Sequence, residues 1–160
     1  FMLCKYQPYK VHEIISVFSK GKHLYQPQMT EGQPYVSGKG TSGDITNNVK
    51  KTQTVNTGTR YPRSILRYNT DKARGGLHPT QKPVALLEYL IKTYTKAGDT
   101  VLDNCMGSGS TAVAAINTGR NYIGFETNPQ YYEIAMKRAC LTAFGVPANL
   151  IKEAIKNENH

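Results

Sequence analysis

The sequence lacks features that define several broad classes of protein. It contains no tryptophan and only three cysteines, and it has no run of about 18 apolar residues that would span a bilayer. The cysteines, Cys4, Cys105 and Cys140, are odd in number and far apart, which excludes a disulfide framework and a Cys-x-x-Cys metal site. We therefore expect a protein without a membrane segment that works in the reducing cytoplasm.

Acidic residues are also scarce, and their scarcity is uneven. The 160 residues include 20 Lys and Arg against 11 Asp and Glu, a formal net charge of +9. Residues 1–80 hold 12 basic and 4 acidic side chains, net +8, whereas residues 81–160 hold 8 and 7, net +1. A basic half joined to a near-neutral half favours a polyanionic partner such as nucleic acid. The alternative is a solvated basic surface that only maintains solubility.

The basic half has little regular pattern. Residues 11–18 are rich in apolar and β-branched types, which predicts a buried strand. Residues 19–60 carry many Gly, Pro, Asn and Ser and have no sustained period, which is typical of a functional or partly disordered loop. Residues 61–68 predict a short extended segment. We expect residues 1–77 to form a strand followed by a loop-rich, basic segment.

The near-neutral half is regular. Its hydrophobic spacing and turn signals predict a helix, strand, helix, strand and helix in that order, over residues 83–95, 100–103, 111–117, 121–126 and 129–144. Two strands joined by a helix must be parallel neighbours with a right-handed crossover. Residues 78–145 therefore predict part of a doubly wound, Rossmann-like α/β sheet, and residues 146–160 a C-terminal tail.

Three features of this half converge on one predicted site. Asp103 ends the first strand, the Gly107-Ser-Gly109 turn follows it, and Glu126 ends the second strand, 126 − 103 = 23 residues later. In such sheets ligands bind at the carboxyl ends of the strands. Glycines allow the backbone to approach a ligand, and a carboxylate can accept both hydroxyls of a ribose. The pattern indicates a nucleoside-containing cofactor.

Asp103 helps to identify that cofactor. The run from Gly107 to Ala112 satisfies the dinucleotide fingerprint G-x-G-x-x-G/A, but a carboxylate at the mouth of the loop would repel a pyrophosphate. S-adenosylmethionine (SAM) instead carries an α-ammonium and a sulfonium, which an acid attracts. The residues thus favour SAM over a dinucleotide. The alternative is that Asp103 caps the next helix and the glycines only form a turn.

These residues resemble the DNA aminomethyltransferases, which methylate adenine N6 or cytosine N4. The resemblance covers about residues 8–143 and is carried by the segments 12–18, 60–64, 78–83, 101–111 and 123–126. It implies that Asp103 lies near the methionine ammonium of SAM, that Glu126 binds the ribose, and that Lys82 helps to hold the carboxylate. Cys105 stands where many members carry a phenylalanine against the adenine. The full implied set for SAM is Thr80, Gln81, Lys82, Asp103, Gly107, Ser108, Gly109, Ser110 and Glu126.

The order of the motifs resembles the permuted subclass in which the catalytic half comes first. The Pro-Pro-aromatic catalytic signature of that family is not in this sequence. The nearest string begins at Asn128-Pro129, which we interpret as a helix N-cap and first helical residue. We therefore expect no catalytic residue and no metal ligand here. The resemblance implies that the chain is the SAM-binding portion of a larger enzyme and is inactive alone. Its expected partners are an upstream catalytic half of the same enzyme and a second copy in a homodimer.

The resemblance also places target recognition in the basic half. The residues expected to meet phosphates or bases of double-stranded DNA are Arg60, Arg63, Arg67, Lys72 and Arg74. Two other functions are weighed against a DNA methyltransferase: a non-catalytic SAM- and DNA-binding module, and a dinucleotide-dependent oxidoreductase.

Overall fold

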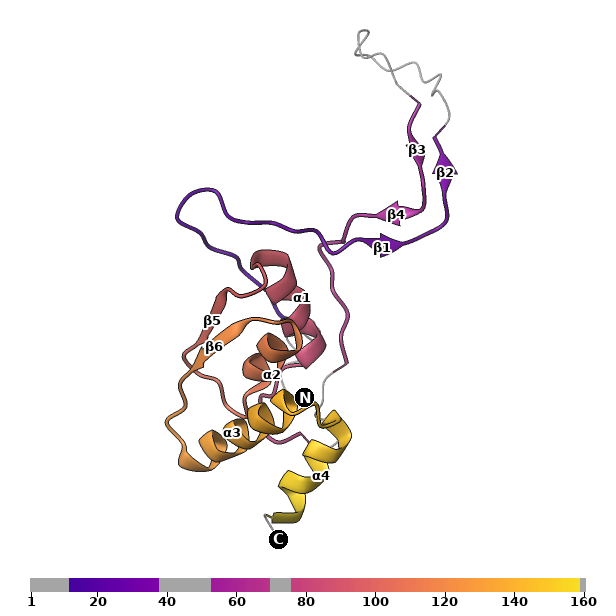
Figure 1. Cartoon of the computed structure of the whole chain (residues 1–160). Coiled ribbons are helices and arrows are strands. Elements are labelled where there is room, and N and C mark those ends of the chain that lie inside the picture. The colour runs from indigo at the N-terminus through magenta and orange to yellow at the C-terminus, as the bar shows by residue number, and fades with distance from the viewer. Residues whose placement is uncertain (1–11, 38–52, 70–75, 159–160) are drawn as a thin grey trace, which may run out of the picture.

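An α/β body and a long arm that projects from it make up the chain (Figure 1). The computed structural model describes residues 12–37, 53–69 and 76–158. The body is built from α1 (Val84–Tyr94), β5 (Thr100–Asp103), α2 (Ser110–Asn117), β6 (Asn121–Gly124), α3 (Pro129–Ala143) and α4 (Ala148–Glu158). None of the described helices is long and apolar enough to cross a membrane.

The sheet of the body confirms the predicted parallel pairing. β5 and β6 pair in parallel, from Thr100 opposite Asn121 to Asp103 opposite Gly124, and α2 connects them. All five predicted elements are present, with boundaries that differ by at most two residues. β6 ends at Gly124, so Glu126 lies just beyond the strand.

The core lies on one face of this small sheet. Ile91 of α1 packs with Ala114 and Ala115 of α2, and Val101 and Tyr122 of the strands pack against that cluster. The two alanines have no exposed surface, so α2 lies close to both α1 and the sheet. The opposite face is open: Leu102 is 63% exposed, and Ile123 and Phe125 are exposed as well.

The C-terminal helices extend the body. Asn128 caps α3 by accepting hydrogen bonds from the amides of Gln130 and Tyr131, and Pro129 is the first helical residue, as predicted. The segment predicted as a C-terminal tail contains α4, whose Ile151 and Ile155 are buried. Its contacts with α3 join it to the body.

The arm is a narrow antiparallel ribbon. β1 (Thr30–Glu31) pairs with β4 (Thr59–Arg60), and β2 (Tyr35–Val36) pairs with β3 (Val55–Asn56). Arg60 holds the ribbon together: it donates to Asn56 Oδ1 and the Gln33 carbonyl, and its guanidinium lies 4.8 Å from the centroid of the Tyr35 ring.

The prediction of a buried strand over residues 11–18 is wrong. Residue 11 lies outside the described residues, and residues 12–18 form no strand and are exposed throughout. Ile14 and Phe18 are 83% and 91% exposed. An apolar, β-branched run becomes a strand only where another strand offers its backbone groups, and neither β5 nor β6 pairs with this segment.

Candidate functional site

The two predicted carboxylates lie at the same edge of the sheet. The Phe125 amide donates to the Asp103 carbonyl at 2.9 Å, which extends the pairing of β5 and β6 by one bond. Asp103 therefore ends one strand and Glu126 follows the other, at the carboxyl ends where ligands of α/β sheets bind.

Glu126 is joined directly to the glycine loop between β5 and α2. Its Oε2 accepts from the Gly107 amide at 2.9 Å and its Oε1 from the Asn128 amide at 2.8 Å. Hydrogen bonds from the Asn128 and Gly107 amides lower the pKa of Glu126, against a smaller opposing effect of desolvation. Glu126 is therefore an ionised acceptor at neutral pH.

Asp103 is held by the same loop. Its Oδ1 accepts from the Cys105 amide at 3.0 Å and its Oδ2 from the Thr111 hydroxyl at 2.5 Å. Gly109, not Asp103, stands at the N-cap position of α2, and no side chain caps that helix. The interpretation of Asp103 as a helix cap is therefore wrong. Cys105 is exposed between Asp103 and the glycines.

The glycines are required by packing within the body. Gly109 has φ +78°, and a Cβ added there would lie 2.9 Å from the Cβ of Ala135 on α3. Gly107, with φ +52°, lies against the ring of His78. Residues 106–110 are buried, so the loop is fixed on α3.

The serines of the loop turn toward the interior. Ser108 is 2% exposed, and its hydroxyl donates to Gln81 Oε1 at 3.3 Å. Arg138 of α3 donates from Nη1 to the Ser108 carbonyl at 2.6 Å and lies 3.4 Å from the Ser110 hydroxyl. Sequence reasoning assigned Arg138 no role. The available signal was an arginine within the small-residue stripe that Ala135 and Ala139 form along α3.

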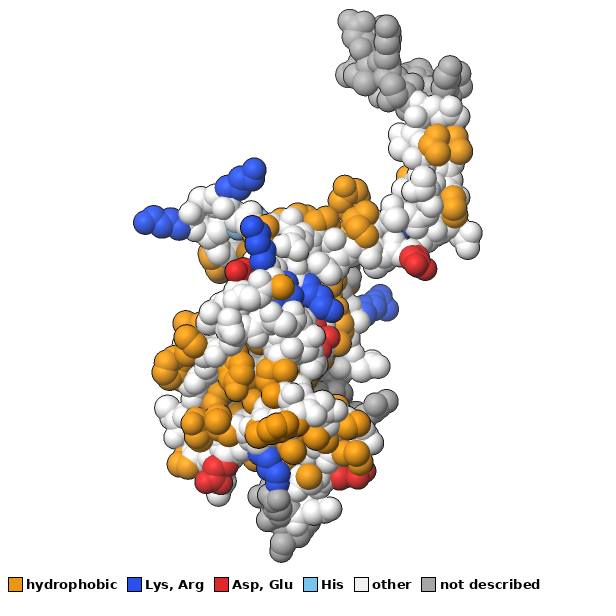
Figure 2. Space-filling model, viewed as in Figure 1, with side chains coloured by type: hydrophobic (Ala, Val, Ile, Leu, Met, Phe, Trp, Pro, Cys, Tyr) orange, Lys and Arg blue, Asp and Glu red, His pale blue; other side chains and the backbone are white. Residues whose placement is uncertain are grey.

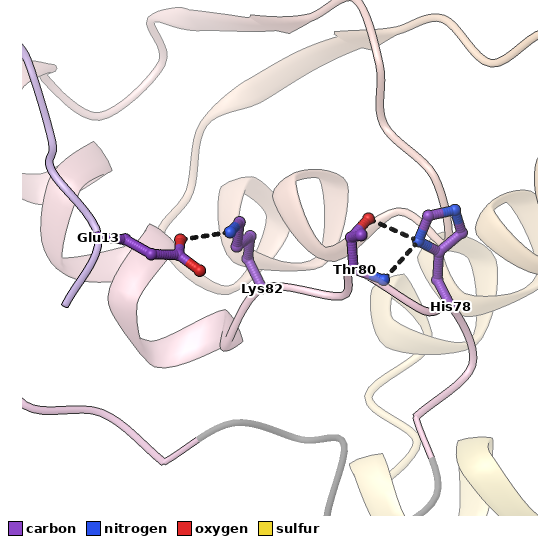
Figure 3. A network of polar contacts seen from close by, with 4 residues as sticks. All are labelled: Glu13, His78, Thr80 and Lys82. Carbon is purple, nitrogen blue, oxygen red and sulfur yellow. Dashed lines mark hydrogen bonds and ion pairs between the residues drawn. The ribbon is translucent and has the colours of Figure 1, made fainter. Parts of the chain in front are cut away.

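The segment before α1 lies next to the loop, since His78 faces Gly107 and Gln81 accepts from Ser108. Figure 3 shows the polar contacts within this segment and with Glu13. His78 Nδ1 accepts from the Thr80 amide at 3.2 Å and lies 3.1 Å from the Thr80 hydroxyl. The Lys82 ammonium lies 2.5 Å from a carboxylate oxygen of Glu13, although both side chains are substantially exposed, 49% and 80%. Lys82 thus already binds a carboxylate in this structure.

A cavity of about 400 Å³ opens beside this segment, lined by Gly76, Leu77, His78, Pro79 and Tyr131. The His78 and Tyr131 rings meet edge to face with 4.2 Å between their centroids. Sequence reasoning missed both rings as site residues. No group of His, Cys, Asp and Glu among the described residues is suited to hold a metal ion.

The predicted DNA-binding arginines lie elsewhere, between the arm and α1. Arg60, Arg63 and Arg67 line a cavity of about 620 Å³ together with tyrosines of the connecting segment and Tyr89 of α1. Figure 2 shows basic side chains gathered where the arm meets the body. Burial, with a smaller effect of Tyr89, raises the pKa of Tyr68 in this cavity. Lys72 and Arg74 lie outside the described residues.

The two carboxylates and the glycine loop lie at the carboxyl edge of a parallel sheet, which is the edge where α/β proteins bind their ligands. The sequence profile of the DNA methylase family, whose members modify N6 or N4 amines, matches residues 4–137. The chain therefore belongs to this family. The resemblance drawn from the motifs is confirmed at the level of the family.

Individual relatives match part of the chain. The chain is 43% identical over 83 residues to the type II methyltransferase M.BglI of Bacillus subtilis, covering 52% of this chain and 23% of that protein. It is 42% identical over 78 residues to the DNA adenine methyltransferase YhdJ of Escherichia coli, covering 49% and 25%. The chain thus spans about a quarter of the length of these relatives.

A solved structure, the M1.HpyAVI–SAM complex, matches at 48% identity over 39% of this chain and 32% of that chain, with a TM-score of 0.38. The family assignment rests on the sequence match and not on this superposition.

Proposed function

We propose that this chain is the SAM-binding and partial DNA-recognition portion of a cytoplasmic DNA methyltransferase that acts on an exocyclic amine, adenine N6 or cytosine N4. The observation that carries the proposal is the junction of Asp103, Gly107 and Glu126 at one edge of the β5–β6 sheet. Family membership supports the reaction class.

The chemistry of the site suits SAM. Glu126 stays ionised and can accept from ribose hydroxyls, and Asp103 presents negative charge to an ammonium. Lys82 holds the Glu13 carboxylate, so the same ammonium suits the carboxylate of the methionine moiety. Thr80 and Gln81 directly precede Lys82, and we assign them to the same end of SAM. When bound, SAM supplies the electrophilic methyl group.

Ser108, Gly109 and Ser110 contribute differently from what the resemblance implies. Their side chains or packing contacts are directed at Gln81, Ala135 and Arg138. We infer that they support the loop from beneath, while Gly107 and the two carboxylates face the cofactor.

For the DNA surface we propose the arm and its base. The ribbon is two strands wide, a shape that the major groove of DNA admits. Arg63 and Arg67 lie at its base, where they could contact the flanking phosphates. Arg60 acts through the ribbon, which it stabilises. The target base must leave the stack to be methylated. We place the groups that engage its amine outside this chain.

The open face of the sheet indicates where that partner would lie. Parallel sheets are covered on both faces, yet Leu102, Ile123 and Phe125 are exposed. We propose that the upstream catalytic half of the same enzyme covers them. A second copy of the chain is the alternative, and light scattering coupled to size exclusion distinguishes a dimer from a monomer.

Calorimetric titration of the chain with SAM tests the proposal. We expect saturable binding that Asp103→Ala abolishes and Glu133→Ala, an exposed acid on α3, leaves unchanged. NAD serves as the control ligand, because selective NAD binding would favour an oxidoreductase. A folded chain that binds neither ligand would contradict the proposal.

A further inference from the structure

A buried guanidinium lies under the glycine loop. Arg138 is 8% exposed, although it sits on α3 between the small residues Ala135 and Ala139. Burying a cation is costly unless its donors meet good acceptors. Packing alone does not require a cation there, because an apolar side chain of similar length would fill the space.

Three acceptors of Arg138 belong to the loop and the first residue of α2. Nη1 lies 2.6 Å from the Ser108 carbonyl, 3.1 Å from the Ser108 hydroxyl and 3.4 Å from the Ser110 hydroxyl. The carbonyl contact fixes the backbone between Gly107 and Gly109. The conformation of the loop is therefore coupled to the position of α3.

Ser108 continues the contact into a second segment. Its hydroxyl donates to Gln81 Oε1, which also accepts from the Leu77 amide at 3.0 Å. Arg138, the loop and residues 77–82 thus form one connected network. On its outer side the same loop donates its Gly107 amide to Glu126.

We propose that Arg138 is a positioning residue for the cofactor: it fixes the glycine loop from beneath and, through Ser108, aligns residues 77–82 with it. This inference rests on the proposed function, because the aligned residues are those assigned to SAM. Arg138 itself does not contact the cofactor. Its loss would misplace the Gly107 amide and the Gln81 side chain together.

The geometry suggests a graded series of variants. The three contacts run through one nitrogen, so Arg138→Lys can restore part of them, whereas Arg138→Met removes the donor and keeps most of the length. Thr118→Val is the matched control. It deletes buried hydrogen bonds to the Ala114 and Ala115 carbonyls at the far end of α2, without touching the loop.

The test combines SAM titration, thermal unfolding and hydrogen exchange of the ligand-free chain. We expect Arg138→Met to raise the Kd for SAM about tenfold or more, because it removes charge-assisted hydrogen bonds. Arg138→Lys keeps the charge and should recover most of the lost affinity. Thr118→Val should lower the unfolding temperature and leave the Kd unchanged. Amides of residues 77–82 and 106–110 should exchange faster in Arg138→Met and not in Thr118→Val.

Two results would overturn the proposal. The first is a folded Arg138→Met chain that binds SAM with the Kd of the wild type. The second is an equal rise in Kd in Arg138→Met and Thr118→Val when their losses of stability are equal. If Arg138→Met does not fold, Ser108→Ala is tested in its place. We then expect the amides of residues 77–82 to exchange faster than in the wild type. Unchanged exchange would contradict the proposed role of Arg138 in aligning this segment. If the wild-type chain binds no SAM, the proposed function fails, and the exchange data alone then decide whether Arg138 positions the loop.

Discussion

Every hydrophobic side chain that the described structure buries lies between Ile91 and Ile155, whereas residues 12–37 and 53–69 bury none. The body closes its helices over one face of a sheet, and the arm is a ribbon of two-residue strands. An isolated two-stranded ribbon is marginally stable in water. The buried residues of the body therefore carry most of the stability of the described structure, while the arm depends on local polar contacts.

The largest effect should come from breaking the contact between the glycine loop and α3. Gly109→Ala places a Cβ 2.9 Å from the Ala135 Cβ at φ +78°, so we expect the free energy of unfolding to fall by about 3 kcal/mol. Gly119→Ala is the control, because φ is +71° but no atom lies within 4 Å, and it should cost about 1 kcal/mol. Urea unfolding followed by circular dichroism measures both. Equal losses would show that packing at Gly109 is not the cause.

A smaller, confined effect should follow from breaking the arm. Arg60→Ala removes the contacts to Asn56, Gln33 and Tyr35. Amides of the ribbon should exchange faster, while the unfolding free energy of the body changes by less than about 0.5 kcal/mol. Arg63→Ala is the control, because it removes the same positive charge at an exposed position. A body destabilised as strongly as by Gly109→Ala would disprove the independence of the two regions.

The stability of the body should depend on pH through Glu126. Because its pKa is lowered in the folded state from the ordinary 4.5, Glu126 contributes stability that is complete above pH 4.5 and is lost as the pH falls through the lowered pKa. The difference in unfolding temperature between wild type and Glu126→Gln should therefore be constant near neutral pH and shrink in acid. A difference that grows on acidification would contradict this sign.

The smallest effect should come from the ion pair between the N-terminal segment and the body. Glu13 and Lys82 are both exposed, so Glu13→Gln should change the unfolding free energy by less than about 0.5 kcal/mol, and high salt should remove the difference. Glu133→Gln is the control, since it removes an exposed acid elsewhere in the body. A larger or salt-independent loss would mean that residues 12–18 help to hold the body together.

The body could be predicted from its sequence because its elements are local. The helical spacing before Thr95, the Asn128-Pro129 start of α3 and the Gly-rich turn after Asp103 each determine structure within a few residues. The parallel pairing of β5 with β6 then follows from connectivity. The same logic placed Asp103 and Glu126 at one edge of the sheet.

The remaining features depend on contacts between distant segments. Residues 12–18 have the composition of a buried strand, but no strand of the described chain pairs with them. The inward orientation of Ser108 and Ser110 depends on Arg138, which lies about 30 residues later and on another element. No periodicity encodes such a contact, so the supporting side of the site was missed.

Exposed Cys105, between the two anionic ends of the strands, gives the chain a built-in attachment point for an optical reporter. With Cys4 and Cys140 replaced by serine, a single environment-sensitive dye could be attached there by thiol chemistry. Its emission would follow motion and occupancy of the glycine loop in real time. Cys105 is thus a position from which the proposed cofactor site can be observed directly.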